Sequence, residues 1–441
     1  MTECNRASLS FSSLFRRKIS ADFDGGRLTS DAGGLLLREV DRRTGLTAAL
    51  ADCIVDPRDS EKVIHDVQTM LAQRIGGIAL GYEDLNDHDA LRSDPVMQVI
   101  SECSPDPDTP LASPATLCRF ENRITRESLA RMSGVLVDQF IASFKRPPKE
   151  LILDFDATDD RVHGDQEGKF YHGYYDHYCY LPLYVFCGER LLCAYLRPSN
   201  IDPALHSRAI LRLLVNRLRA KWPNVKIIFR ADSGFCRWKL LKYCDEHAIG
   251  YVVGIGRNKV LERRALLHTA FASSRFVLTG KKQRHFGEVR YAAKTWDRQR
   301  RVIVKAEYLS KGPNTRFVVT NLTDAPQDIY DGIYTQRGEM ENRIKEQQLG
   351  LFADRTSCHK FVANQFRLLL ASAAYVLIEH LRREALRGTE LARAQVSTIR
   401  LKLFKIAARV RVSVRRIILH LPTSCPYQSV LQRIIARLVP S

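Results

Sequence analysis

The sequence predicts an α/β protein in which a core of mixed strands and helices follows a helical region and precedes a basic helical tail. Three observations lead to this fold class. Apolar residues recur at helical spacing from Ser30 to about Phe144, and the spacing becomes strand-like directly after the linker Lys145–Lys149. Short strand-like segments separated by turns then fill residues 257–325. Because the chain has 441 residues, we expect two or three packed units.

The first region, residues 1–148, is predicted to be helical. A segment with three prolines at 104–110 interrupts the helical pattern. Ser113 then begins a short helix that carries Arg119 and Arg123. A short Arg-bearing helix after a turn fits the recognition helix of a helix-turn-helix motif, and it fits an ordinary helical hairpin equally well.

The region after the linker predicts a ribonuclease H-like core, which we place at residues 149–256 and 326–380. Its predicted elements follow the order β-β-β-α-β-α-β of that fold. The strands are expected at Leu151–Asp156, Cys179–Cys187, Leu191–Leu196, Val225–Ala231 and Gly250–Ile255, with a helix at Asp202–Lys221.

Residues 257–325 are predicted to form an inserted β-domain. Its strands are expected at Arg275–Leu278, Val289–Ala292, Val302–Leu309 and Arg316–Leu322. Helix resumes from about Tyr330 to Leu351 and again from Asn364 to Arg383, and residues 381–441 complete the chain as a basic helical tail.

The charge of the chain indicates a polyanionic partner. There are 68 Lys and Arg against 49 Asp and Glu, a net charge of +19. From Leu381 onward the chain contains 13 Lys and Arg residues but only two acidic ones, Glu384 and Glu390. Nucleic acid is the first candidate, although a basic surface can also serve only to keep molecules apart.

The sequence gives no indication of a membrane or an oxidising compartment. The longest apolar runs, such as Leu181–Cys187, are too short to span a bilayer, and the N-terminus lacks the apolar core of a signal peptide. The eleven cysteines show neither CxxC pairs nor zinc-like spacing. We therefore expect a cytoplasmic protein with no membrane partner.

Two acidic residues stand where predicted strands end. Asp156 closes the first strand of the core and Asp232 follows the fourth. Because the first and fourth strands are neighbours in a ribonuclease H-like sheet, the two carboxylates would converge. Oxygen ligands suit Mg²⁺, and two ions about 4 Å apart can promote an in-line displacement at phosphorus. Either residue alone could instead be a helix cap or a turn former.

A third carboxylate is expected from the helix after the insertion. Tyr334, Arg337, Glu341 and Gln348 recur at helical spacing and share one face, which makes Glu341 the choice. The alternative is a surface ladder of ion pairs formed by Arg337, Glu341 and Lys345. Three other acids compete with the chosen ones: Asp154, Asp160 and Glu339.

Several motifs together resemble the DDE transposases of bacterial insertion sequences, and specifically the group named after insertion sequence thirteen-eighty. They are Leu153-Asp-Phe-Asp-Ala-Thr-Asp-Asp160, Tyr180-Leu-Pro-Leu-Tyr184, Arg197-Pro-Ser-Asn200, Arg230-Ala-Asp-Ser-Gly-Phe235 and Tyr334-Thr-Gln-Arg-Gly-Glu-Met-Glu-Asn342. The resemblance covers nearly the whole chain. It implies that Asp156, Asp232 and Glu341 are the catalytic, metal-binding acids.

The resemblance also carries one departure. The wider superfamily has Tyr-x2-Arg-x3-Glu-x6-Lys on this helix; Tyr334, Arg337 and Glu341 match it, but the Lys position holds Gln348. The motif implies DNA contacts for Tyr334 and Arg337. Lys345, one turn after Glu341, could reach a phosphate in place of the missing lysine.

The resemblance implies a cut-and-paste transposase that binds the ends of its insertion sequence. Such an enzyme cleaves by metal-dependent hydrolysis with two Mg²⁺ ions, which Mn²⁺ can replace, and joins the freed 3′-hydroxyl ends to target DNA. Its partners would be double-stranded DNA, as terminal inverted repeats and target, and further copies of itself on DNA, with no small-molecule substrate. It would act in the bacterial cytoplasm near the nucleoid.

Two assignments of DNA contacts remain at this stage, together with two alternative functions. Arg119 and Arg123 are candidates for reading the element's ends. Trp296 in the insertion could stack on a base turned out of the helix, as in related transposases that form DNA hairpins, or could cover the core of the insertion. The alternative functions are a metal-dependent nuclease without strand transfer and a non-catalytic DNA-binding protein, either a domesticated transposase or a repressor.

Overall fold

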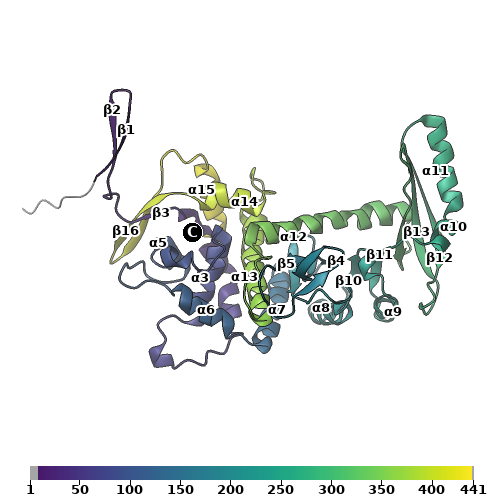
Figure 1. Cartoon of the computed structure of the whole chain (residues 1–441), viewed down its shortest axis with the longest axis horizontal. Coiled ribbons are helices and arrows are strands. Elements are labelled where there is room, and N and C mark those ends of the chain that lie inside the picture. Colours follow the sequence, from purple (N-terminus) through teal and green to yellow (C-terminus); the bar gives the residue numbers. More distant parts are fainter. Residues whose placement is uncertain (1–7, 440–441) are drawn as a thin grey trace, which may run out of the picture. The chain divides into compact units, whose positions relative to one another are not determined.

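The computed structural model describes residues 8–439 and divides the chain into two compact units (Figure 1). We call residues 124–372 the central unit. Residues 1–123 and 373–441, from the two ends of the chain, form the terminal unit. The sequence-based domain boundaries, after residues 148 and 380, differ from this division.

A nine-stranded mixed sheet organises the central unit. Its strand order is β12-β13-β15-β11-β10-β4-β8-β9, and the short β14 (Gly312–Pro313) pairs with β13. The five strands predicted for the core are β4 (Glu150–Ala157), β8 (Leu183–Cys187), β9 (Arg190–Tyr195), β10 (Lys226–Ala231) and β11 (Gly250–Ile255). β4 is parallel to β10 and antiparallel to β8, and β10 is parallel to β11. The first and fourth of the predicted strands are therefore neighbours, as expected.

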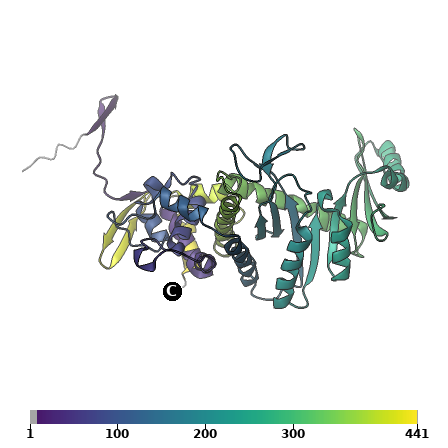
Figure 2. The ribbon, with the colours of Figure 1, turned by 60° about the horizontal axis from the view of Figure 1, so that its bottom comes forward.

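Helices cover the sheet on the side that holds the main core. They are α7 (Arg126–Ala142), α8 (Ser207–Lys221) and α9 (Trp238–Glu246), which lie together below the strands in Figure 1 and come forward in Figure 2. Strand residues that alternate along the chain point towards them, and Phe155 meets Phe229 edge to face at 5.0 Å. On the other side, a smaller cluster around Ile228 packs against the π-helical segment η4 (Asp328–Tyr334).

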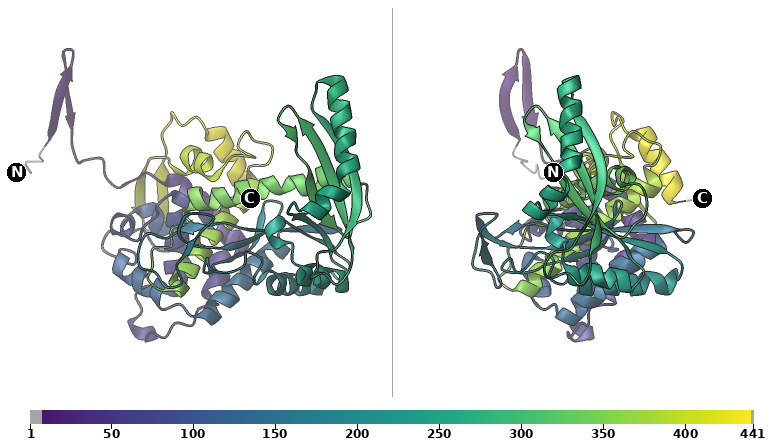
Figure 3. Two further views of the ribbon diagram at one scale, coloured as in Figure 1. Left: turned by 45° about the vertical axis from the view of Figure 1, so that its right-hand side comes forward. Right: turned by 90° about the vertical axis from the view of Figure 1, so that its right-hand side faces the viewer.

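The predicted inserted β-domain is only partly correct. Residues 259–279 form two helices, α10 (Lys259–Arg264) and α11 (Leu266–Thr279), so the strand expected at Arg275–Leu278 is wrong. The strands that follow, β12 (Gln283–Tyr291), β13 (Arg300–Leu309) and β15 (Arg316–Thr320), do not form a separate sheet, because β15 pairs with β11 and extends the core sheet. Figure 3 shows α11 lying along β12 and β13, and Ala272 of α11 is buried against them.

A second correction concerns the strand expected at Cys179–Cys187. The chain forms two strands there, β7 (His177–Tyr180) and β8, separated at Leu181-Pro182. Proline lacks the N–H that a ladder requires, so the strand cannot continue through it. β7 belongs to a small separate sheet with β5 (Asp160–Arg161) and β6 (Phe170–His172).

The terminal unit is mainly helical, with two hairpins. Its helices are α1 (Leu35–Thr44), α2 (Leu46–Ala51), α3 (Val67–Leu80), α4 (His88–Leu91), α5 (Pro95–Ile100), α6 (Pro114–Asn122), α14 (Val396–Ile399) and α15 (Gln428–Leu438). One hairpin is β1 (Leu9–Leu14) with β2 (Arg17–Ala21). The other is β16 (Ala408–Ser413) with β17 (Arg416–His420), which adds to β3 (Leu28–Thr29).

The second hairpin makes the expectation of an all-helical tail wrong. Residues 409–412 read Arg-Val-Arg-Val, an alternation with the period of a strand, and the many charged residues of the segment mask this period.

Helix α13 (Phe361–His380) carries the chain from the central into the terminal unit and continues as the π-helical turn Leu381–Ala385. By length and hydropathy alone, the stretch Phe361–Ala385 could cross a membrane, in contrast to the expectation that every apolar run is too short. Its most apolar window is 78% buried inside the protein, as in a helix that packs within a core.

Candidate active site

Asp156 and Asp232 lie at one edge of the central sheet. β4 and β10 run parallel, with Phe155 opposite Ala231. The residue that follows each of them, Asp156 on β4 and Asp232 directly after β10, therefore lies at the same edge of the sheet. Asp232 directly follows β10 and caps the short helical turn Ser233–Phe235, where its Oδ1 accepts a hydrogen bond from the Gly234 N–H at 2.8 Å. The sheet thus brings together the two acids that the sequence predicted.

The carboxyl of Asp156 is in an unusual electrostatic position. Burial raises its pKa to about 7, the positive charge of Arg337 opposes the rise, and the negative charge of Asp232 adds to it. Burial and the neighbouring negative charge both disfavour the ionised form of Asp156. A strongly shifted acid of this kind is typical of a functional site, and a bound cation would favour its ionised form.

Glu341 joins this site through Arg337. Glu341 lies in the first turn of α12 (Gly338–Leu351), and Arg337 immediately precedes that helix. One guanidinium nitrogen of Arg337 donates to Asp156 Oδ2 at 2.8 Å and the other donates to Glu341 Oε1 at 2.7 Å. Arg337 therefore holds the third predicted acid beside the first. Its pair with Glu341 is one rung of the predicted surface ladder, but Arg337 also reaches Asp156 on β4, which a ladder confined to the helix would not do.

The three acids suit a divalent cation, although two of them, Asp156 and Glu341, are hydrogen-bonded to Arg337 in this structure. Asp156, Asp232 and Glu341 offer only carboxylate oxygens, which are the ligands that Mg²⁺ prefers. Within residues 8–439, no three Asp, Glu, His or Cys side chains already stand close enough to hold a metal ion. The positive charge that Asp156 and Glu341 attract is at present the guanidinium between them, and a metal ion would require Arg337 to release them.

The competing acid Asp154 is tied to Arg230. The two residues face each other across β4 and β10, and Arg230 Nε donates to Asp154 Oδ1 at 3.0 Å while a second nitrogen donates to Oδ2 at 2.5 Å. A third nitrogen of Arg230 donates to the Ile333 carbonyl at 2.6 Å. This buried, bidentate pair gives Asp154 a structural role. Arg230 stands in the motif Arg230-Ala-Asp-Ser-Gly-Phe235, but its role depends on the pairing of β4 with β10, which the sequence alone does not show.

The other two competing acids are also accounted for. Asp160 is fully buried, burial raises its pKa well above the ordinary value, and Gln348 Nε2 donates to its Oδ1 at 2.9 Å. Gln348, at the superfamily's lysine position, also donates to the Asp159 carbonyl at 3.0 Å and so fastens α12 to the segment after β4. Glu339 is exposed and makes none of the contacts that join Glu341 to Arg337.

Tyr334 lines a cavity beside Asp232. Its ring lies 5.4 Å from that of Tyr330, and Gly254 on β11 leaves room for its hydroxyl, because a Cβ there would come within 2.5 Å of it. The cavity measures about 390 Å³ and opens next to Ser233. Three cationic side chains also line it: Arg257, Lys305 and Arg316. It is a cavity rich in hydrogen-bond donors beside the acidic site.

The remaining predicted contacts are distributed differently. Lys345 is exposed on α12, one turn after Glu341. Trp296 lies in the loop between β12 and β13, partly buried against the main core, with its ring edge to face with Tyr291 at 5.5 Å and Arg300 over it at 5.4 Å. These contacts are the ones expected of a tryptophan that covers a core.

Arg119 and Arg123 of the terminal unit have unlike environments. Arg119 is exposed on α6, where it donates to Thr116 Oγ1 at 3.2 Å. Arg123, which follows α6, pairs with Asp56 at 3.5 Å, lies over the Phe120 ring at 5.3 Å, and has its pKa lowered by burial. Arg123 is thus engaged within the unit, and only Arg119 faces solvent.

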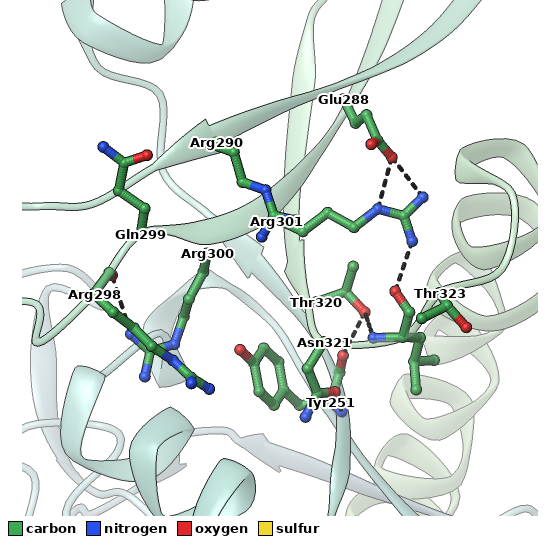
Figure 4. A pocket seen from close by; sticks show the side chains of 11 residues that line it. Tyr251, Glu288, Arg290, Arg298, Gln299, Arg300, Arg301, Thr320, Asn321 and Thr323 are labelled. Atoms are coloured by element: carbon green, nitrogen blue, oxygen red, sulfur yellow. Dashed lines mark hydrogen bonds and ion pairs between the residues drawn. The ribbon is translucent and has the colours of Figure 1, made fainter.

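A second cavity, of about 450 Å³, lies at the opposite edge of the sheet (Figure 4). It opens where β11 and β13 begin and where β15 ends, whereas Asp232 stands at the far end of the parallel β10. Its arginines are largely neutralised by neighbours: Arg301 binds Glu288 at 2.7 Å, and Arg300 binds Asp245 and Asp297 at 3.1 and 2.8 Å. This cavity is distinct from the acidic site.

Comparison with known proteins identifies the class to which this fold and site belong. The chain is a DDE transposase, an enzyme of DNA transposition. Specifically, it belongs to the family described as Transposase DDE domain group 1, whose model matches residues 11–441. No curated protein matches the sequence. A solved structure of the piggyBac transposase synaptic complex with hairpin DNA aligns with a TM-score of 0.42 and 11% identity, covering 86% of this chain and 80% of that chain.

Proposed function

We propose that the chain is a cut-and-paste transposase of the insertion sequence thirteen-eighty group, with a ribonuclease H-like core. It would bind the ends of its element, cleave them by hydrolysis, and join the freed 3′-hydroxyls to target DNA. The observation that supports this most directly is the convergence of Asp156 and Asp232 at one sheet edge, with Glu341 linked to Asp156 through Arg337.

Asp156, Asp232 and Glu341 would hold two Mg²⁺ ions, which Mn²⁺ could replace. Such ions lower the pKa of an attacking oxygen and stabilise the leaving oxygen of an in-line displacement. The residues around them would position the strand. Arg337, once released from Asp156 and Glu341, has a planar guanidinium suited to bidentate contact with a phosphate.

The cavity beside Asp232 supports a DNA strand as the substrate. The side chain of Arg316 makes no ion pair or hydrogen bond with the other described residues, and the same holds for the hydroxyls of Tyr330 and Tyr334. Unpaired donors next to an acidic site can bind the phosphates that flank the one to be cut. Lys345 would add a further phosphate contact from α12. Double-stranded DNA is thus the proposed partner, with further copies of the chain assembling on it, in the cytoplasm near the nucleoid.

The test is replacement of each acid by alanine. Asp156→Ala, Asp232→Ala and Glu341→Ala should each lower the cleavage rate by on the order of a thousandfold or more, because each removes a metal ligand while leaving the phosphate-binding cations in place. Binding to the element's ends should persist. Glu339→Ala, two residues from Glu341 on the same helix and exposed, is the matched control and should cut at the normal rate.

The same assay separates the alternative functions. A nuclease without strand transfer would cut end-labelled duplex but would never join it to a second DNA. A non-catalytic DNA-binding protein would retain the duplex in a gel and leave it uncut with either Mg²⁺ or Mn²⁺. If Asp156→Ala cut normally while Asp154→Ala did not cut, the ligand assignment would be wrong.

A further inference from the structure

The hairpin β1–β2 in the terminal unit is an antiparallel ribbon whose register shifts once, between Phe11 and Leu14. Leu9 pairs with Ala21, Ser10 with Ser20, Phe11 with Ile19, and Leu14 with Arg17, so Phe15 and Arg16 form a two-residue loop. Phe15 has a positive φ of 54°, as the first position of such a loop can require, and its side chain is 94% exposed.

Nothing within the described chain covers this hairpin. β1 and β2 pair only with each other, and every residue from Ser8 to Gly26 is exposed. An isolated two-stranded ribbon is at best marginally stable in water. Its two faces also differ, because the Leu9–Ala21 and Phe11–Ile19 pairs project on one side and the Ser10–Ser20 pair on the other. An exposed ribbon with one apolar face indicates a surface that binds a partner.

The charge of the hairpin indicates which partner. Arg16, Arg17 and Lys18 follow one another at the tip, and residues 9–21 contain no Asp or Glu. A two-stranded ribbon fits the major groove of DNA, which is about 12 Å wide. Serine hydroxyls along one face and consecutive cations at the tip are the groups that bind phosphates and sugars. A second copy of this chain, with a net charge of +19, would repel such a tip.

We propose that the β1–β2 hairpin is a DNA-binding arm that lies in a groove of the duplex, with Arg16, Arg17 and Lys18 on the phosphates. This inference rests on the proposed function, since it assumes that duplex DNA is the partner. It adds a contact element to the terminal unit where the helix α6 supplies only Arg119, because Arg123 is paired with Asp56.

The experiment measures binding of the full chain to a labelled duplex from the DNA flanking its coding sequence, over a series of salt concentrations. The test variant is Arg16→Gln/Arg17→Gln/Lys18→Gln. Each lost phosphate contact removes about 0.9 from the slope of log affinity against log salt, so three make the slope shallower by up to about 2.7 and weaken binding up to about a hundredfold near 0.15 M salt.

A matched control removes the same charge elsewhere. Lys145→Gln/Arg146→Gln/Lys149→Gln alters three exposed cations in the loop between α7 and β4 and should leave the slope unchanged. Equal salt slopes for the wild type and the tip variant would overturn the inference. Equal losses of slope and affinity in the tip and control variants would also overturn it, because they would reflect net charge alone.

A third variant tests the rival partner. If Phe11→Ser/Ile19→Ser halved the molecular mass in solution while the tip variant bound DNA normally, the hairpin would be an interface between copies and the inference would be overturned. Failure of the proposed function would give a different result: the wild-type chain would bind the duplex with the expected salt slope but would neither cut nor join it.

Discussion

Asp154 and Asp156 lie two residues apart on β4 and point to the same side of the sheet, yet their surroundings give them different roles. Asp154 faces Arg230, which neutralises it with two hydrogen bonds. Asp156 lies beside Asp232, which opposes its ionisation, and shares Arg337 with Glu341. A single arginine, Arg230, placed two residues before Asp232 on the neighbouring strand, pairs with Asp154 and leaves Asp156 as the candidate ligand.

His88 provides a prediction about pH at the scale of one residue. It is fully buried on α4, where Gln73 Nε2 lies 3.1 Å and an Arg74 nitrogen 3.3 Å from its ring nitrogens. Burial, and then the charge of Arg74, lower its pKa from 6.5 to about 3. The folded state therefore favours the neutral ring, and the stability that this contributes is complete above pH 6.5 and is lost as the pH falls towards 3.

The measurement is the free energy of unfolding in urea between pH 7 and pH 4. His88 alone should lower it by up to about 1.4 kcal/mol per pH unit below pH 6.5, so His88→Gln should flatten the decline. His420→Gln, at an exposed position of the same unit, is the control and should keep the wild-type slope. If His88→Gln declined as steeply as the wild type, the ring would not be the group that titrates.

Trp296 gives a second prediction at the scale of one residue. Its stacking on a DNA base is not tested by the structure and stays a prediction. If the ring holds a base turned out of the helix, Trp296→Ala should spare the first nick and slow hairpin formation by about ten- to a hundredfold, because stacking is worth roughly 1 to 3 kcal/mol per base. Trp296→Phe should recover part of the rate. A gel that resolves nicked, hairpin and fully cut products over time measures both steps.

The packing of Trp296 supplies the contrasting outcome. Because the ring contacts Tyr291 and Arg300, its removal should also lower the melting temperature of the central unit. Equal losses of nicking and hairpin products, together with a lower melting temperature, would assign Trp296 a structural role only.

At the scale of elements, the tail is both a basic surface and a part of the core of the terminal unit. Its basic hairpin, β16–β17, has Arg411, Arg415 and Arg416 exposed. Other tail residues are fully buried, among them Leu386, Val396, Leu403 and Phe404. Removing the tail to test DNA binding would thus also remove apolar packing from the unit.

Two tail variants should therefore behave differently. A chain that ends at Arg382 should lose the fold of the terminal unit, seen as rapid proteolysis of residues 30–123, because the cavity left by several large side chains costs several kcal/mol. Arg411→Gln/Arg415→Gln/Arg416→Gln should keep the melting temperature and give a shallower salt dependence of DNA binding. An unchanged slope in this folded variant would exclude β16–β17 from the DNA-binding surface.

Some elements of the fold could be predicted from the sequence, and others could not. β4 and β10 are short apolar runs bounded by a linker or an acid, and such strands buried on both faces leave a clear pattern. The end of α11 resembles a strand in sequence because of Val277 and Leu278, but these side chains are 77% and 84% exposed at the end of a helix that Gly280 terminates. Local composition could not show that this helix packs its small residues, such as Ala272, against the sheet.

The acids of the candidate site were predictable for a related reason, and their partners were not. Asp-Phe-Asp lies near the end of β4, and Arg-Ala at the end of β10 is followed by Asp232. Alignment of Asp156 with Asp232 therefore places Asp154 opposite Arg230. That alignment depends on the register of two strands far apart in sequence. The contacts of Gln348 with the segment after β4 likewise depend on tertiary packing, which no spacing along α12 reveals.

At the scale of the whole molecule, the terminal unit is assembled from both ends of the chain, with the entire central unit between them. A ribosome adding about 5–20 residues per second would release the first segment roughly 15 to 60 s before the last one. The nascent chain would therefore complete the unit that bears the three acids while the unit that bears both hairpins is still lacking its second half. A chain cut short within the last segment would then hold the three acids in a complete central unit while its terminal unit stays unfinished, so the order of synthesis would part the candidate site from the complete terminal unit.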